Sequence, residues 1–132
     1  MNLNVPGFRL DGVRVLVVDD DEATRYVTRL TLQTEGAIVT ESRTARDALD
    51  VLQQERPDVL ISDLSLPGED GFWLIRTVRE LSIAHGGGTP AAALTGHVTA
   101  EDRAQVLRAG FSSTSPSPWN RPAWSASSPS WP

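Results

Sequence analysis

Residues 14–21 decide the fold of this 132-residue chain and read RVLVVDDD. Four consecutive apolar residues, three of them β-branched, are typical of a strand that is buried on both faces of a parallel sheet. Aspartates follow at the strand's carboxyl end, which is the edge where such sheets hold their ligands. Residues 59–63 read VLISD and repeat the pattern of an apolar strand followed by a carboxylate.

Helical and strand patterns alternate along the chain. Apolar residues at helical spacing predict helices over Glu22–Glu35, Ala45–Gln54, Phe72–Leu81 and Ala100–Ala109. Short apolar runs predict further strands over Ala37–Thr40 and Ala91–Thr95, with a flexible glycine-rich connection over His85–Thr89. This order predicts an α/β fold, a doubly wound parallel sheet with helices on both faces.

Composition restricts the function classes. The net charge is −5, so nonspecific nucleic-acid binding is not expected, and no apolar run has the ~18 residues of a membrane span. Cysteine is absent, which excludes disulfides and thiolate metal sites, and the first residues, MNLNVPGF, do not resemble a signal peptide. We therefore expect one cytoplasmic domain that does not contact membranes.

Carboxylates follow two of the predicted strands. Asp19 and Asp20 end the first, Asp63 ends the third, and the hydroxyl of Thr95 ends the fourth. Each alone is as well explained by a helix cap, a turn or an ordinary strand residue, but together they predict a site at one edge of the sheet. Carboxylates without basic partners repel one another, and hard oxygen ligands favour Mg²⁺.

The chain resembles the receiver domain of two-component response regulators over about residues 14–118. The matching segments are VLVVDDDEATR, PDVLISDLSLPGEDGFWLI, PAAALTG and the helix ending LRAGF. The resemblance implies a flavodoxin-like fold with strand order 2-1-3-4-5. It also implies that Asp63 is the phosphoacceptor, that Thr95 is the switch hydroxyl, and that Gly96 leaves room for a phosphoryl donor.

The resemblance further implies a Mg²⁺ site and partners. Asp20 and Asp63 would hold the ion directly, Asp19 through water, and Ser65 through its backbone carbonyl. The donor would be a phosphohistidine on a histidine kinase or a histidine phosphotransfer domain. The chemistry would be limited to self-phosphorylation and autodephosphorylation, so the domain is not expected to be an enzyme. The segment Leu10–Arg14 resembles the receivers of hybrid sensor kinases.

The last residues depart from the family pattern. The family places a lysine before a proline at the end of the fifth strand, but here the residues are Ser117 and Pro118, and the chain contains no lysine. The fifth strand, over 112–116, is polar, and prolines oppose a fifth helix. We therefore expect a receiver over 1–118 and an irregular Ser/Pro/Trp-rich tail over 119–132, which leaves a sheet face open to self-association.

A shifted reading frame, a truncation and a genuine tail remain open as origins of this terminus. Two other functions also remain. The missing lysine favours a pseudo-receiver that binds partners without phosphorylation. An aspartate-nucleophile phosphatase would need the pattern D-x-D-x-T after the first strand, but Ala23 stands where the threonine should be.

Overall fold

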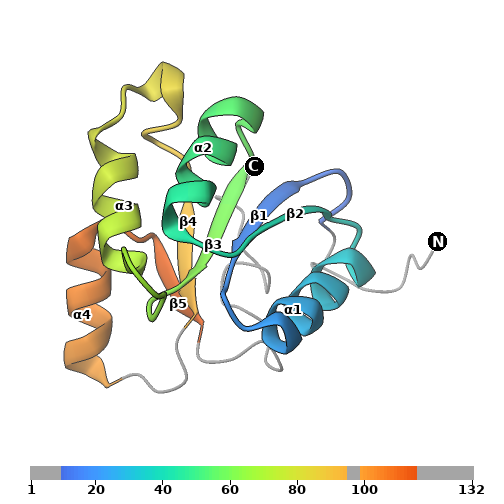
Figure 1. Ribbon diagram of the computed structural model, residues 1–132, viewed down its shortest axis with the longest axis horizontal. Helices are drawn as coiled ribbons and strands as arrows, with labels where there is room; N and C mark the ends of the chain where they lie inside the picture. The colour runs from blue at the N-terminus through green and yellow to red at the C-terminus, as the bar shows by residue number, and fades with distance from the viewer. Residues whose placement is uncertain (1–9, 95–98, 116–132) are drawn as a thin grey trace.

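The computed structural model describes residues 10–94 and 99–115. Strands and helices alternate along this part of the chain (Figure 1). The elements, in chain order, are β1 (Arg14–Val18), α1 (Glu22–Thr34), β2 (Ile38–Ser42), α2 (Ala45–Glu55), β3 (Val59–Asp63), α3 (Gly71–Glu80), the short 3₁₀ helix η1 (Ile83–His85), β4 (Ala91–Leu94), α4 (Ala100–Ala109) and β5 (Ser113–Ser115). Among the described helices, none has the length and apolar character to cross a membrane.

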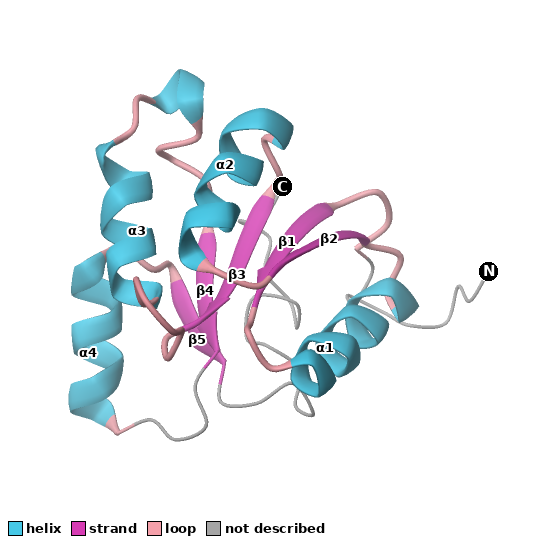
Figure 2. Cartoon of the chain, in the orientation of Figure 1, coloured by secondary structure: helices cyan, strands magenta, loops and turns pink. Residues whose placement is uncertain are grey.

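The strands form one parallel sheet in the order β2-β1-β3-β4-β5, which confirms the predicted fold class. Helices α2, α3 and α4 cover one face, and α1 lies on the other (Figure 2). Successive residues of a strand point to opposite faces, so Leu16 and Val18 pack under the three helices while Val15 and Val17 pack on the side of α1. All four side chains are buried, as the sequence of β1 predicts.

Helix caps fix the elements that begin at the site edge of the sheet. Asp21 caps α1, Thr44 caps α2 and Asp70 caps α3, each accepting a hydrogen bond from a backbone N–H of the first turn. Thr99 and Asp102 form a capping box at the start of α4. Helix α3 begins one residue earlier than predicted, at Gly71, because the Asp70 cap sets its first turn.

Two strands differ from their predicted bounds. Strand β2 runs to Ser42 rather than Thr40, because its pairing with β1 continues through Val18↔Ser42 despite the polar residues. Strand β5 is present but covers only three residues, and it pairs with β4 from Ala92↔Ser113 to Leu94↔Ser115. The predicted position of a fifth helix, Ser117 and the tail lie outside the described residues.

The glycine-rich segment before β4 is a packed turn, not the flexible connection that its composition predicts. Arg79 of α3 donates hydrogen bonds from Nη1 to the carbonyls of Gly87 and Thr89 and from Nε to the carbonyl of Gly110. A Cβ at Gly87 would lie 2.0 Å from the carbonyl oxygen of Leu81, so close approach of the backbone explains the glycine there. Sequence periodicity could not reveal these contacts because they join distant segments.

Candidate functional site

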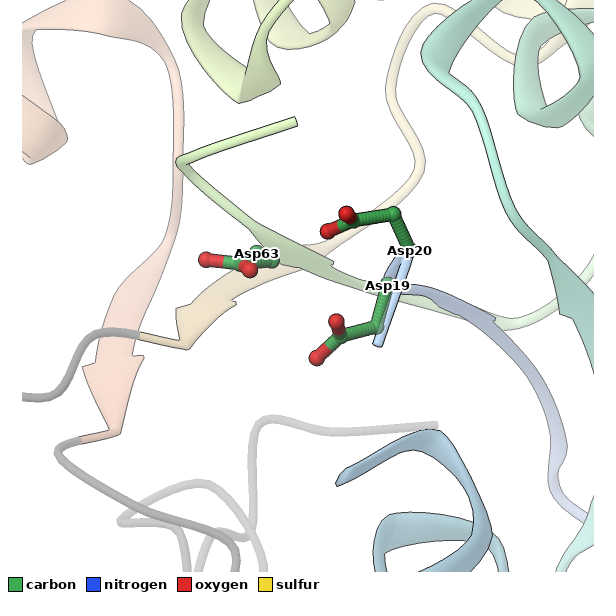
Figure 3. A group of neighbouring side chains, drawn as sticks. All are labelled: Asp19, Asp20 and Asp63. Carbon is green, nitrogen blue, oxygen red and sulfur yellow. The ribbon is translucent and has the colours of Figure 1, made fainter. Parts of the chain in front are cut away.

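The carboxylates of Asp19, Asp20 and Asp63 come together at the carboxyl ends of β1 and β3 (Figure 3). One oxygen from each lies within 4.8 Å of an oxygen from each of the others. Asp19 is buried, Asp63 is half-buried and Asp20 is exposed, so the group opens to solvent on one side. The predicted convergence of these three residues is confirmed.

Hydrogen bonds hold both the side chain and the backbone of Asp19. The Asp21 N–H donates to Asp19 Oδ1 at 2.9 Å, and Arg25 Nη1 donates to the Asp19 carbonyl at 2.8 Å. Arg25 Nε also contacts Glu41 Oε1 at 2.8 Å. The guanidinium of Arg25 therefore ties the acidic loop to β2.

The third aspartate of the run has a different role. Asp21 caps α1 through hydrogen bonds from the Thr24 N–H and hydroxyl, and these lower the pKa of the Asp21 carboxyl. The position of an aspartate in the run DDD thus decides its role. The first two residues belong to the carboxylate group, whereas the third starts the helix.

Asp63 is held by the loop that follows β3. The Ser65 N–H donates to Asp63 Oδ1 at 3.1 Å, and the Gly71 N–H donates to the Leu64 carbonyl at 3.0 Å. A Cβ on Gly71 would lie 2.4 Å from the Asp63 carbonyl oxygen and 2.8 Å from Leu64 Cα. These neighbours are backbone atoms, so they cannot move aside without displacing the end of β3.

We therefore expect Gly71→Ala to destabilise the protein by about 2–4 kcal/mol, the range of a strongly overpacked core position. Gly68→Ala is the matched control, since Gly68 lies three residues earlier, in the loop before α3, and a Cβ added there would meet no atom within 4 Å. Its backbone φ of +77° should cost only about 1 kcal/mol. Chemical denaturation of both variants measures the difference, and equal losses would show that steric overlap at Gly71 is unimportant.

Burial and mutual repulsion make the charged state of the site costly. The pKa of Asp19 is raised to about 6, mainly by desolvation and in addition by the nearby carboxylates of Asp63, Asp20 and Asp21. Desolvation also raises the pKa of Asp63, with Asp20 and Asp21 adding to the effect. Hydrogen bonds from backbone N–H groups oppose both shifts.

The raised pKa of Asp19 has a consequence for stability in the absence of metal. The folded protein holds a proton on Asp19 more tightly than the unfolded chain, whose ordinary aspartate pKa is near 3.8. This contribution to stability is complete below pH 4 and is lost as the pH rises through about 6. The largest contribution that Asp19 makes in this way to the free energy of unfolding is about 3 kcal/mol.

Thermal unfolding in EDTA between pH 4.5 and 7 tests this expectation. Asp19→Asn keeps an oxygen that can accept the Asp21 N–H, so the variant should be more stable than the wild type at pH 7 and should lose less stability across the range. Parallel profiles for the two proteins would contradict the assigned pKa.

Several predicted site residues lie outside the described residues, namely Thr95, Gly96 and Ser117. Ser65 lies in the loop beside Asp63, where the resemblance places it, although the role of its carbonyl stays a prediction. The contact of Arg25 with the acidic loop was missed, because no local pattern marks an arginine that bonds a carbonyl six residues earlier.

The donors present suit a hard divalent cation. The site offers three carboxylates, with no histidine or thiolate in the group, and Mg²⁺ prefers such oxygen ligands while retaining waters. The electrostatic causes that act on Asp19 and Asp63 are all carboxylates, so a cation would relieve repulsion that no described side chain relieves. The arrangement therefore fits Mg²⁺ and leaves Asp63 accessible as an oxygen nucleophile.

Comparison with known proteins gives a consistent set of relatives. Residues 15–121 match the family model described as the response regulator receiver domain. An uncharacterized 14.6 kDa protein of Leptolyngbya boryana, encoded in the sodA1 3′ region, is 50% identical over 97 residues, which cover 74% of this chain and 72% of that protein. Response regulator MprA of Mycolicibacterium vanbaalenii is 35% identical over 107 residues, which cover 81% of this chain and 45% of the regulator.

Solved structures show the same relationship. Chemotaxis protein CheY4 of Vibrio cholerae superposes with a TM-score of 0.75 at 31% identity, covering 83% of this chain and 89% of that one. A response regulator from Chloroflexus aurantiacus superposes with a TM-score of 0.73 at 28% identity, covering 79% and 84% of the two chains. The chain thus spans less than half of MprA but most of the two solved chains.

Proposed function

This chain belongs to the response regulator receiver domain family, and we propose that it accepts a phosphoryl group on Asp63 from a phosphohistidine. The observation that carries the proposal is the convergence of Asp19, Asp20 and Asp63 at the carboxyl edge of the sheet. We assign the receiver to residues 1–118 and the irregular tail to 119–132. A cytoplasmic location and a histidine kinase or phosphotransfer domain as donor are part of the proposal.

Asp63 is the nucleophile in this reaction. A carboxylate oxygen of Asp63 forms a bond to phosphorus while the bond from phosphorus to the donor's imidazole nitrogen breaks, and the nitrogen keeps the electron pair. The Ser65 N–H, which donates to Asp63 Oδ1, orients the carboxylate for attack. The buried Asp19 and the half-buried Asp63 resist ionisation without a counter-charge.

Mg²⁺, when bound, would neutralise charge on the carboxylates and on the oxygens of the transferring group. Asp20 and Asp63 would hold the ion directly, Asp19 through water and Ser65 through its carbonyl. Asp19, fixed by the Asp21 N–H and by Arg25, keeps the acidic loop in place. Thr95 is proposed to bind the new phosphoryl group and to shift the surface of α4 and β5 toward a second packing.

A phosphorylation-independent pseudo-receiver is the second candidate, and the lack of lysine is the observation that favours it. Without that cation, a phosphoryl group on Asp63 would lose one counter-charge. Partner binding would then depend on a surface that does not respond to phosphate. Self-association through the sheet face also stays a prediction.

Incubation with acetyl phosphate and Mg²⁺ separates the two candidates. The wild type should take up one phosphoryl group in a reaction that requires Mg²⁺, and Ser117→Lys should increase the rate about tenfold by restoring a cation. Ser82→Lys is the control, since Ser82 is exposed between α3 and η1. Uptake by Ser117→Lys alone would support the pseudo-receiver, and no uptake by any variant would refute the phosphoacceptor.

A further inference from the structure

A cavity of about 590 Å³ opens beside Asp63, between the loop after β3 and helix α4. Helices α3 and α4 lie side by side at this end of the molecule (Figure 1). Apolar side chains, including Leu66, Phe72 and Val106, form the inner wall. Asp63, Asp70 and Asp102 bring three carboxylates to the same cavity.

The described lining of this cavity carries negative charge without a basic residue. No lysine elsewhere in the chain can supply one. Two described arginines near the site are engaged outside the lining, because Arg25 binds Glu41 and the Asp19 carbonyl while Arg46 pairs with Glu69 and stacks over Trp73. The cavity therefore combines an apolar wall and an acidic rim, and its complement is a cation on an apolar stem.

We propose that this cavity binds the side chain of an arginine presented by a partner protein. The methylene stem would pack on Leu66 and Val106, as long basic side chains do on apolar surfaces. The planar guanidinium can fork to a carboxylate and stack on the ring of Phe72, which an ammonium group does less well. The volume lies within the usual range for ligand pockets, so there is room for the guanidinium with its remaining water.

The position of the cavity favours a partner protein over a free small molecule. Asp70 and Asp102 at the rim are exposed, so a bound side chain can remain attached to a backbone outside the cavity. Asp63 also borders the opening, so a protein that approaches this aspartate covers the same surface. The inference goes beyond phosphorylation because arginine binding requires no phosphoryl donor.

Titration with N-acetyl-arginine N-methylamide, followed by two-dimensional ¹H–¹⁵N NMR, tests the proposal on the full chain. The titration is done in saturating Mg²⁺, so that the arginine amide does not compete for the carboxylates of Asp19, Asp20 and Asp63. No phosphoryl donor is added, so that phosphorylation does not contribute to the shifts. We expect saturable shifts at the residues lining the cavity with a dissociation constant of about 1–10 mM, as suits a single side chain. The corresponding citrulline amide, a neutral isostere, should bind at least fivefold more weakly, and the lysine amide should lie between the two.

Two double variants show whether the cavity carboxylates are responsible. Asp70→Asn with Asp102→Asn removes two charges and keeps oxygens that can maintain the caps of α3 and α4. Asp47→Asn with Glu101→Gln makes the same change in net charge at exposed positions outside the lining. The first pair should weaken arginine binding at least fivefold and the second less than twofold.

Any of the following results would overturn the proposal. Equal binding of the citrulline and arginine amides would show that the cation is not recognised. Equal weakening by the two double variants would show only a general effect of net charge. Shifts centred away from the cavity, or no saturable shifts up to 50 mM ligand, on the order of five times the upper expected constant, would show that the cavity does not bind arginine.

Discussion

Asp63→Asn should reduce phosphoryl uptake from acetyl phosphate at least 100-fold, to the background of the assay. The substitution replaces the attacking carboxylate oxygen with a neutral amide of the same shape, which is a far weaker nucleophile. The amide oxygen can still accept the Ser65 N–H, so the loop after β3 should keep its conformation. Intact-protein mass spectrometry measures the fraction that carries one phosphoryl group.

Asp50→Asn is the matched control because Asp50 is exposed on α2, and its substitution should leave uptake unchanged. The lability of the product gives a second test, since an acyl phosphate hydrolyses in base and a phosphoserine or phosphothreonine does not do so at the same rate. If Asp63→Asn acquired a phosphoryl group of the same lability at the wild-type rate, Asp63 could not be the acceptor.

Mg²⁺ should stabilise the wild type by about 3 kcal/mol at 100 times its dissociation constant, because it binds only the folded arrangement of the carboxylates. This corresponds to a rise of roughly 10 °C in Tm for a domain of this size. Asp20→Asn should abolish most of that response. In EDTA, however, the same variant should be about 1 kcal/mol more stable than the wild type, because one of three repelling carboxylates has been removed and its exposure to solvent screens the repulsion.

Asp21→Asn is the control for Asp20→Asn. It removes one negative charge from the acidic run without removing a proposed Mg²⁺ ligand. Asn is a good helix cap, and Asp21 is not one of the three grouped carboxylates, so this variant should keep the full response to Mg²⁺. Thermal unfolding of the three proteins, with and without Mg²⁺, measures both effects. A full Mg²⁺ response in Asp20→Asn would remove Asp20 from the proposed ligands.

The sequence allowed the fold to be predicted because its strands are buried on both faces and therefore read as continuous apolar runs. Strands β1 and β3 have the predicted bounds, and the aspartates that follow them meet as the topology requires. Helix α4 also has its predicted bounds, because the Thr99–Asp102 capping box and Gly110 mark its ends. In each case a local pattern and the global topology favour the same structure.

The remaining features depend on contacts between distant segments. Arg25 reaches the acidic loop and β2 at once, and Arg79 holds the glycine-rich turn, yet neither arginine has a distinctive local context. The cavity beside Asp63 was also missed, because no local pattern links Asp70, at the start of α3, with Asp102 on α4. Their side chains border one space only because α3 and α4 are neighbours in the fold.

The hydrogen bonds of Arg79 have a mechanical consequence. Arg79 lies near the end of α3 that is distant from Asp63, and it bonds the carbonyl of Gly110, where α4 ends. Asp102, near the opposite end of α4, borders the cavity. Any swing of α4 against α3 that preserves this bond must pivot about the carboxyl ends of the two helices. A small rotation of α4 about Gly110 would then produce a larger movement at the other end of α4. That movement would widen or narrow the cavity beside Asp63.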